Sequence, residues 1–456
     1  MSLIESRSPQ APEDVVAQVP DNGPGEVAEA VRQAREAGVD WAARPATERA
    51  IALSACAEAL AEASAELAAL VVREVGKPIG EATGEVARGV AILRYFAQAA
   101  LLPEGDVFPA ADGVSLLHTR RRPHGVAGLI TPWNFPVAIP LWKAAPALAY
   151  GNGVVLKPAE QAPAVALRLA ELFAGALPGG VLRVVTGAGA AGAALVETAD
   201  AISFTGSTAV GRLVRQAAAA RGVPAQCEMG GQNPSVVLPD ADLDLAARTI
   251  AGAAMGYAGQ KCTATSRVIV VGDADGFAER LVAAVEALEV GDPGQASTAV
   301  GPVIEPAARS AVVAAAQRAA GRGAKILTGG VALDWNGWYA APTVVTGVPE
   351  GDELLTEEVF GPICAVVPAA SADDAVRAAN AVRHGLVAAL FTRDLASALT
   401  LAPRLETGMV KVNGPTAGVD FHAPFGGEKE SSYGPREQGP AARDFYTRTV
   451  TVTLTP

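Results

Sequence analysis

The chain has 456 residues, and its 36 basic against 48 acidic side chains give a net charge of −12. This acidic balance argues against nucleic acid or an anionic membrane as a partner, because both are bound through clustered lysine and arginine. Four cysteines and four histidines are too few for a disulfide scaffold or a zinc cluster. We therefore expect no metal, with room for one reactive thiol.

Length and composition favour a large α/β enzyme. At about 100–200 residues per domain, the chain has room for about two to four domains. Apolar residues make up 50% of the chain and aromatic residues 5%, which fits α/β layers better than an all-β sandwich. Neither a secretory signal nor a membrane-spanning helix is expected, because the first ten residues lack the signal pattern and every apolar stretch is interrupted. The default location is a reduced cytoplasm.

The first part of the chain is predicted to be helical. Apolar residues recur at helical spacing over Pro24–Ala37, about Thr47–Val75 and about Glu81–Ala100. Gly76 ends the second of these helices. The pattern then changes, and Val114–Arg122 predicts a β segment that carries three arginines.

Strands and helices alternate after this segment. Strands are expected at 125–130, 154–156, 182–186 and 201–204, with helices at 139–150, 162–173, 190–198 and 208–220. A second series begins near Gln232, with candidate strands at 236–238, 267–271, 326–328, 363–367 and 387–391. This alternation predicts two doubly wound parallel-sheet domains. The β extension at 114–122 and residues 447–454 complete the predicted architecture.

Two strand-to-helix junctions are candidates for binding phosphate. Residues 187–192 (GAGAAG) match the dinucleotide pattern, but the acidic residue expected about 20 positions later is missing. We interpret this segment as a small-residue loop that lets a helix begin close to the sheet. Ser207 is the better candidate, because its hydroxyl and the free N–H groups of a helix N-terminus could meet an anion.

Three side chains carry the strongest candidate chemistry. Cys262 follows a glycine turn, Glu228 stands beside two glycines, and Pro132 and Pro136 fix the backbone around the amide of Asn134. Each has an ordinary alternative when taken singly, since the cysteine could be inert and the glutamate could lie in an exposed turn.

Together, these segments resemble the aldehyde dehydrogenase superfamily over nearly the whole chain. Its motifs stand in family order at 76–78 (GKP), 132–136 (PWNFP), 157–160 (KPAE), 204–207 (FTGS), 228–231 (EMGG), 259–262 (GQKC), 357–362 (EEVFGP) and 424–427 (PFGG). The resemblance implies a dinucleotide-binding domain at 1–113 and 124–229, and a catalytic domain at 230–430. It also implies an oligomerisation arm at 114–123 and 440–456, and hence a homodimer or homotetramer.

The resemblance implies a mechanism through a cysteine thioester. Cys262 would attack the aldehyde carbon as a thiolate, while the Asn134 amide and the Cys262 backbone N–H hold the oxyanion. Hydride transfer to a nicotinamide would leave a thioester, which water deprotonated by Glu228 would hydrolyse. Glu437 matches a family carboxylate that relays the proton, although a plain salt bridge is an equal alternative.

The resemblance also implies a nicotinamide cofactor site. Its residues would be Lys157 and Glu160 at the adenosine ribose, Gly206 and Ser207 at the pyrophosphate, Glu358 and Phe360 near the nicotinamide ribose, and Thr131 and Trp133 beside them. Because the carboxylate of Glu160 would repel a 2′-phosphate, NAD is favoured over NADP.

In detail, segments 131–142, 232–234, 259–266 and 415–427 look most like α-ketoglutarate semialdehyde dehydrogenases. The family layout would place the substrate beside Arg88, Ala138, Trp142, Lys261, Thr263, His422 and Phe425. Arg88 could bind a substrate carboxylate through two hydrogen bonds. Its alternative is an ion pair within its own helix, to Glu85 or Glu81.

Three departures from the family pattern affect the expected substrate class but not the reaction type. Lys261 directly precedes the nucleophile, Gln232 replaces a common lysine, and residues 430–434 (ESSYG) carry serine where glycine is usual. Two alternative functions remain open. A CoA-acylating enzyme would pass the thioester to a thiol but usually lacks the glutamate that Glu228 supplies, and an inactive binding or structural homologue would not turn over.

Overall fold

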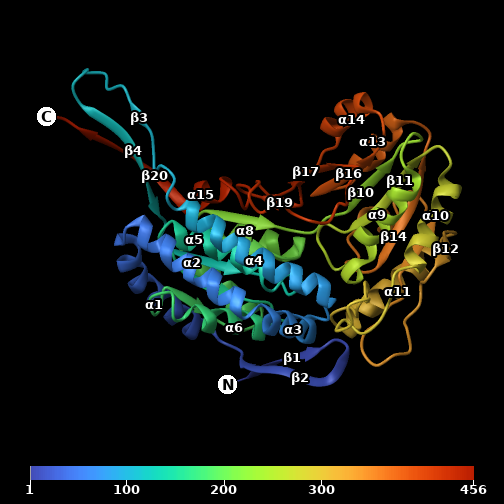
Figure 1. Ribbon diagram of the computed structural model, residues 1–456, viewed down its shortest axis with the longest axis horizontal. Coiled ribbons are helices and arrows are strands. Elements are labelled where there is room, and N and C mark those ends of the chain that lie inside the picture. Colours follow the sequence, from blue (N-terminus) through green and yellow to red (C-terminus); the bar gives the residue numbers. More distant parts are fainter. Residues whose placement is uncertain (1) are drawn as a thin grey trace.

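The computed structural model describes residues 2–456, which form two lobes and a projecting arm (Figure 1). The first lobe surrounds a six-stranded sheet in the order β19-β9-β8-β5-β6-β7. Its strands are β5 (Val126–Ile130), β6 (Gly153–Lys157), β7 (Leu182–Val184), β8 (Ala201–Thr205), β9 (Ala225–Glu228) and β19 (Ser432–Tyr433). The strands β5 to β9 run parallel, and β19 returns from near the chain end to pair antiparallel with β9.

Helices cover both faces of this sheet. They are α1 (Pro24–Ala43), α2 (Ala46–Glu62), α3 (Ser64–Val75), α4 (Ile79–Ala99), α5 (Ala138–Ala149), α6 (Pro163–Phe173), α7 (Gly189–Thr198) and α8 (Thr208–Arg221). Successive residues of β6 point to opposite faces, so Val154 packs with α2 to α6 whereas Val155 packs with α1, α7 and α8. Because both faces are covered, β5 and β6 are buried along their whole length.

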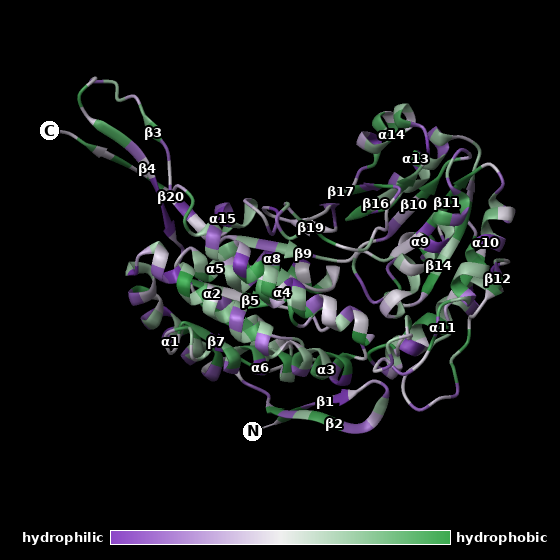
Figure 2. Cartoon of the chain, viewed as in Figure 1, coloured by the Kyte–Doolittle hydropathy of each residue, from purple (hydrophilic) through white to green (hydrophobic). Residues whose placement is uncertain are grey.

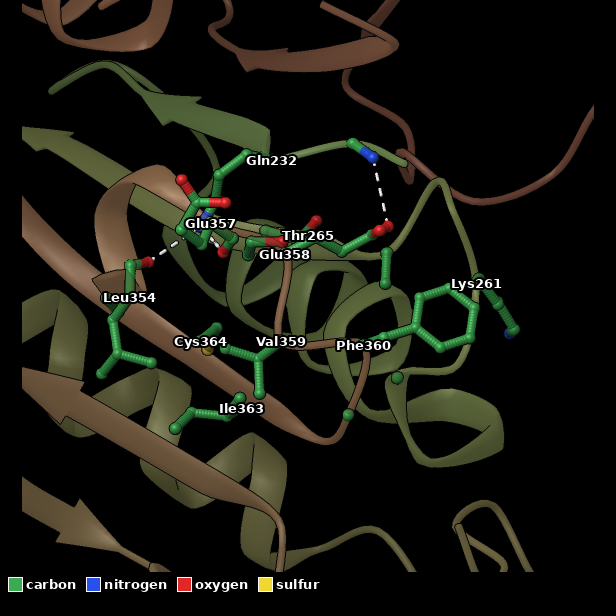
Figure 3. A pocket seen from close by; sticks show the side chains of 16 residues that line it. Gln232, Lys261, Thr265, Leu354, Glu357, Glu358, Val359, Phe360, Ile363 and Cys364 are labelled. Carbon is green, nitrogen blue, oxygen red and sulfur yellow. Dashed lines mark hydrogen bonds between the residues drawn. The ribbon is translucent and has the colours of Figure 1, made fainter. Parts of the chain in front are cut away.

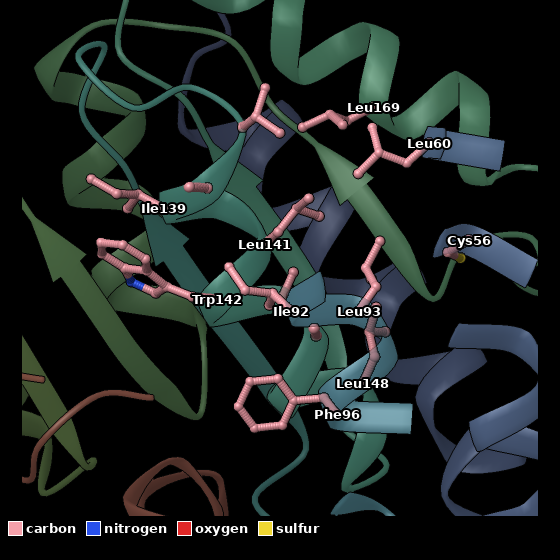
Figure 4. Close-up of a cluster of buried hydrophobic side chains, with 14 of the residues drawn as sticks. Cys56, Leu60, Ile92, Leu93, Phe96, Ile139, Leu141, Trp142, Leu148 and Leu169 are labelled. Carbon is pink, nitrogen blue, oxygen red and sulfur yellow. The ribbon is translucent and has the colours of Figure 1, made fainter. Parts of the chain in front are cut away.

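The largest hydrophobic cluster lies between α2, α4, α5 and this sheet (Figure 4). Leu60, Phe96 and Leu148 are buried within it, together with Cys56. Trp142 belongs to the same cluster but also lines the cavity at Cys262. The core thus fixes one wall of that cavity.

One helix predicted from the sequence is in fact two helices. The segment predicted as about Thr47–Val75 divides at Ala63 into α2 and α3. The hydroxyl of Ser64 donates to the carbonyls of Leu60 (3.1 Å) and Ala61 (2.7 Å), in competition with the helical backbone bonds. Gly76 ends α3 in the left-handed conformation (φ 67°), as its position predicts.

The second lobe contains a seven-stranded sheet in the order β12-β13-β14-β11-β10-β16-β17. Its strands are β10 (Asn233–Val237), β11 (Thr265–Val271), β12 (Lys325–Thr328), β13 (Thr343–Thr346), β14 (Ile363–Ala369), β16 (Val387–Phe391) and β17 (Met409–Val412). Neighbouring strands are parallel except for β12, which pairs antiparallel with β13. The sequence predicts a parallel sheet here, and that prediction is wrong for the edge strand β12.

Helices and short segments complete the second lobe. They are α9 (Leu243–Met255), η1 (Gly256–Gly259), α10 (Ala274–Glu286), α11 (Pro306–Gly321), α12 (Glu353–Thr356), α13 (Ala372–Asn380), α14 (Leu395–Leu401) and η2 (Ala402–Arg404), with β15 (His384–Gly385) paired to β18 (Glu428–Lys429). No helix within residues 2–456 has the length and hydropathy required to cross a bilayer. The same residues contain no group of three or more metal-ligating side chains.

The arm is a three-stranded sheet of β3 (Val107–Phe108), β4 (Leu116–Pro123) and β20 (Thr447–Leu454). It projects from the first lobe beyond α15 (Ala441–Tyr446), and β20 pairs with β4 along its whole length (Figure 1). Hydrophobic residues gather towards its tip and hydrophilic residues towards its base (Figure 2). The three arginines of β4 lie at the end of the strand that precedes Pro123. A hairpin of β1 (Leu3–Ser8) and β2 (Ala11–Pro20), which the sequence did not predict, lies on the opposite side of the first lobe. The division into named domains stays a prediction.

Candidate active site

Cys262 follows an unusual turn at the end of α9. Tyr257, Ala258 and Gly259 all adopt left-handed φ values of 55°, 53° and 66°. The turn is tied down because the Tyr257 hydroxyl donates to the carbonyl of Val75 (3.2 Å). A side chain at Gly259 would collide with the carbonyl of Gly361. Such concentrated backbone strain is typical of functional sites.

Asn233, at the start of β10, fixes the backbone on the other side of the cysteine. Its amide nitrogen donates to the carbonyls of Cys262 and Ala264, at 2.8 Å each. The side chain is buried. Sequence reasoning assigned Asn233 no role, since a single asparagine in a strand gives no sign of what it contacts.

The thiol of Cys262 is half-buried, whereas the other three cysteines are buried. Burial, followed by the carboxylates of Glu358 and Glu228, holds its pKa well above the ordinary value. The thiol is therefore protonated before substrate arrives, and attack on an aldehyde requires a base.

Asn134 follows β5 and lies against the cysteine segment. Its amide nitrogen donates to the carbonyl of Gln260 (2.9 Å), two residues before Cys262. This bond uses one of the two amide N–H groups, and the second stays available as a donor. The buried Asn134 amide thus sits beside the segment that ends in the thiol.

Glu228 ends β9 and is buried. Burial and then the charge of Glu437 raise its pKa well above the usual range. Its Oε2 accepts a hydrogen bond from Ser432 (2.5 Å), while Oε1 has no partner among residues 2–456. A buried carboxyl with a raised pKa is suited to accept a proton.

Glu437 forms the salt bridge that the sequence left open as an alternative. Its carboxylate pairs with Lys143, and both side chains are buried. It also accepts hydrogen bonds from Trp142 (2.6 Å), Gln226 (3.0 Å) and Ser203 (3.1 Å). The ion pair therefore belongs to a larger network next to Glu228.

A cavity of about 670 Å³ brings together most of the predicted cofactor residues. Its lining includes Thr131, Trp133, Lys157, Glu160, Gly206 and Ser207. Residues 188, 189 and 192 of the glycine-rich segment line it as well, and so does Ala193 directly after it, so the small-residue loop borders the cavity.

The polar groups of this cavity suit a dinucleotide. The Lys157 ammonium donates to the carbonyls of Pro158 (2.6 Å) and Gly187 (2.7 Å), and burial lowers its pKa to about 8. Ser207 is exposed and caps α8, so its hydroxyl stands at a helix N-terminus. An ammonium, the carboxylate of Glu160 and a helix N-terminus thus share one cavity.

Glu358 and Phe360 lie in a neighbouring crevice (Figure 3). Glu358 accepts a hydrogen bond from the backbone N–H of Gly231 (3.1 Å), and burial raises its pKa to about 7. The ring of Phe360 lies edge-on to Trp133, with 5.7 Å between the ring centroids. Trp133 therefore connects this crevice with the larger cavity.

Gln232 explains how this crevice is held without the lysine common in the family. Its amide nitrogen donates to the carbonyls of Leu354 (2.9 Å) and Glu357 (3.0 Å), as Figure 3 shows in part. The two bonds fasten the segment that carries Glu358.

A second cavity, of about 260 Å³, opens at Cys262. Arg88, Trp142, Lys261, Thr263 and Phe425 line it as predicted neighbours of the substrate, and Phe135, Ile139 and Val419 are further lining residues. His422 is exposed, and neither it nor Ala138 is part of this lining, so their predicted contact with substrate stays a prediction.

The two cations of this cavity differ in their partners. Lys261 pairs with Glu81 (2.8 Å), which neutralises its charge. Glu85 pairs with Lys77 and accepts hydrogen bonds from the backbone N–H groups of Val137 and Ala138, so its carboxylate already has partners other than Arg88. The alternative of a helical ion pair for Arg88 is therefore wrong, because among residues 2–456 no carboxylate lies within ion-pair distance of it.

Comparison with known proteins agrees with this geometry. The model of the "Aldehyde dehydrogenase family" matches residues 2–452. The chain is 40% identical to alpha-ketoglutaric semialdehyde dehydrogenase of Bacillus subtilis, over 100% of this chain and 95% of the relative. It is 41% identical to alpha-ketoglutarate semialdehyde dehydrogenase of Haloferax volcanii, over 98% and 95% of the two chains.

Solved structures give the same result. The NAD-dependent aldehyde dehydrogenase from Sinorhizobium meliloti superposes with a TM-score of 0.97 at 35% identity, covering 100% of this chain and 92% of the other. PnpE in complex with nicotinamide adenine dinucleotide gives 0.96 at 37% identity, covering 100% and 94%. The chain therefore belongs to the aldehyde dehydrogenase family.

Proposed function

We propose that this enzyme oxidises a carboxylated semialdehyde, of the α-ketoglutarate semialdehyde class, to the corresponding acid with NAD. The observation that carries this proposal is Arg88, a cation that lines the Cys262 cavity and has no ionic partner within residues 2–456. An aldehyde whose far end bears a carboxylate would supply the missing partner. The names of the two curated relatives support the same substrate class.

The proposed chemistry begins at Cys262. A nearby carboxylate takes the thiol proton, and the thiolate attacks the aldehyde carbon to form a tetrahedral thiohemiacetal. Asn134 and the Cys262 N–H stabilise the oxyanion, each donor contributing about 3 kcal/mol. Bound in the cavity at Lys157 and Ser207, NAD would supply the acceptor for the hydride that leaves this adduct, and a thioester would remain. Glu228 then deprotonates the water that hydrolyses the thioester, which favours an acid as product over transfer to CoA.

A panel of aldehydes assayed by NADH absorbance tests the substrate class. Arg88→Met should raise KM for α-ketoglutarate semialdehyde about tenfold or more, because a charge-assisted bidentate contact is lost, and should leave KM for propanal unchanged. Arg94→Met is the matched control, since Arg94 is exposed on the same helix α4. An unchanged KM for the carboxylated aldehyde in Arg88→Met would rule out the anchor.

The CoA-acylating alternative and an inactive homologue are tested on the same preparations. With CoA present, the product should be the free acid and not an acyl-CoA. Cys262→Ala should abolish turnover, and retained activity would exclude the thioester route. The thioester route needs Cys262 in its reduced form, and the cytoplasm is a reducing compartment. A cytoplasmic location therefore stays a prediction.

Assembly into a homodimer or homotetramer is part of this proposal. The arm exposes Val107, Phe108, Leu116 and Leu454, with between 45% and 73% of each residue accessible. β17 forms one edge of the second sheet, and no strand within the described part of the chain covers it. An arm that lies across a second copy, next to such an edge, would bury both features.

A further inference from the structure

Ser432 stands directly opposite Glu228 in the first sheet. The two-residue strand β19 pairs antiparallel with the end of β9, and its register matches Ser432 with Glu228. Directly paired residues of neighbouring strands present their side chains on the same face. Ser432 belongs to the segment that carries serine where the family usually has glycine, so a hydroxyl is added beside the carboxylate.

The direction of the hydrogen bonds through Ser432 is defined by its partners. The backbone N–H of Gly427 donates to Ser432 Oγ (2.6 Å). When Glu228 is ionised its carboxylate can only accept, so the hydroxyl proton then points to Glu228 Oε2 (2.5 Å). Ser432 therefore connects a backbone donor to the carboxylate. Ser431, by contrast, bonds the carbonyl of Gly230 and the N–H of Gly385 and does not touch Glu228.

This hydroxyl is important because the carboxylate has little other support. Glu228 is 2% exposed, and within residues 2–456 Ser432 is the one hydrogen-bond donor to its side chain. At Gly426 a Cβ would lie 2.8 Å from Glu228 Oε1, so the second oxygen occupies space that a glycine leaves open. Burial and the neighbouring Glu437 disfavour the charged form, and the Ser432 bond favours it.

We propose that Ser432 is a positioning residue that keeps the Glu228 carboxylate oriented and ionised for thioester hydrolysis. This inference rests on the proposed role of Glu228 as the base. In that step Glu228 takes one proton from water, the resulting hydroxide attacks the thioester carbonyl, and the carbon–sulfur bond breaks. The acid product leaves, and the Cys262 thiolate is regenerated.

The test separates the two halves of the reaction with propanal, whose oxidation does not depend on Arg88. Stopped-flow NADH absorbance measures the burst, and intact mass spectrometry follows decay of the acyl-enzyme between pH 5 and pH 9. Ser432→Ala should leave the burst amplitude intact. The rate of acyl-enzyme decay falls at low pH as Glu228 is protonated, and this acidic limb of the pH–rate profile should shift to higher pH by about one unit in this variant. Below the limb, decay should be about tenfold slower than in the wild type, as expected for a lost bond to a charged group.

Four further variants make the outcome specific. Ser432→Thr keeps the hydroxyl and should return the acidic limb of acyl-enzyme decay to its wild-type pH. If Ser432→Ala fails to fold, Ser432→Gly takes its place. Ser431→Ala is the matched control, expected to lower Tm without moving the limb. Glu228→Gln should block decay. An unmoved limb in Ser432→Ala with blocked decay in Glu228→Gln would overturn the role of Ser432 alone, whereas normal decay in Glu228→Gln would overturn the proposed base as well.

Discussion

Single side chains in this enzyme hold the reactive segment through backbone carbonyls. Asn233 is the clearest case, because one buried amide serves the carbonyls on both sides of the turn at Cys262. Asn233→Ala leaves two buried acceptors without a donor. We expect it to lower the free energy of unfolding by about 2–4 kcal/mol and kcat at least tenfold. Thermal unfolding and steady-state assays measure both, and Asn336→Ala, at an exposed asparagine, should change neither. Wild-type kcat in Asn233→Ala would show that the turn holds its shape without it.

Glu160 is expected to set the choice between NAD and NADP. It lines the cofactor cavity, where a negative charge would repel a 2′-phosphate. Glu160→Ser should raise kcat/KM for NADP by about tenfold relative to that for NAD. Glu197 lines the same cavity, so Glu197→Ser is the control. If both variants keep the wild-type ratio, Glu160 does not determine the cofactor.

At the scale of elements, Glu74 joins three parts of the first lobe. This buried residue of α3 accepts hydrogen bonds from Ser6 of β1 (2.9 Å) and from the N–H groups of Ala164 (2.7 Å) and Val165 (2.9 Å) in α6. Burial raises its pKa to about 7. Protonation therefore favours the folded state, and the stability that it contributes is lost as the pH rises from about 5 through 7.

Glu74→Gln removes this titration. Between about pH 5 and pH 8, the Tm of the wild type should fall relative to that of the variant. The raised pKa of Glu74 corresponds to a loss of about 3 kcal/mol in the free energy of unfolding over this range. The variant should be less stable overall, because its amide nitrogen faces one of the two backbone N–H donors, which then has no acceptor. Parallel Tm curves for the two proteins would show that Glu74 stays ionised throughout.

Sequence patterns predicted elements well where burial leaves a local signal. The buried strands β5, β6 and β16 are uninterrupted small or apolar runs apart from the final lysine of β6, and they were found. The hairpin β1–β2 was missed because apolar and polar residues do not alternate along its sequence and most of its residues are exposed or partly exposed. The break at Ala63 has no signal in the spacing of the apolar residues, and the antiparallel direction of β12 depends on its partner strand.

The candidate site shows the same limit. Motifs identified Cys262, Glu228 and Asn134, whereas their partners come from distant parts of the chain. Ser432 and Glu228 are 204 residues apart, and Lys261 and Glu81 are 180 apart. Residue patterns carry no information about such contacts. That Arg88 has no ionic partner among the described residues became visible only in the folded chain.

At the scale of the whole molecule, the arm is expected to control assembly. Its apolar side chains are exposed in a single chain, so replacing them costs the monomer little while removing apolar area from an interface. The triple variant V107S/F108S/L116S should sediment as a monomer when the wild type sediments as a dimer or tetramer. Val39→Ser, at an equally exposed site on α1, should assemble normally. An oligomeric triple variant would exclude the arm tip as the main contact.

The pairing of β4 with β20 also sets an order of events during synthesis. Arg121 and Thr447 are hydrogen-bonded but 326 residues apart, so β4 leaves the ribosome long before its partner strand exists. Closing so long a loop comes late in folding. The nascent chain therefore carries an incomplete arm until β20 has been synthesised.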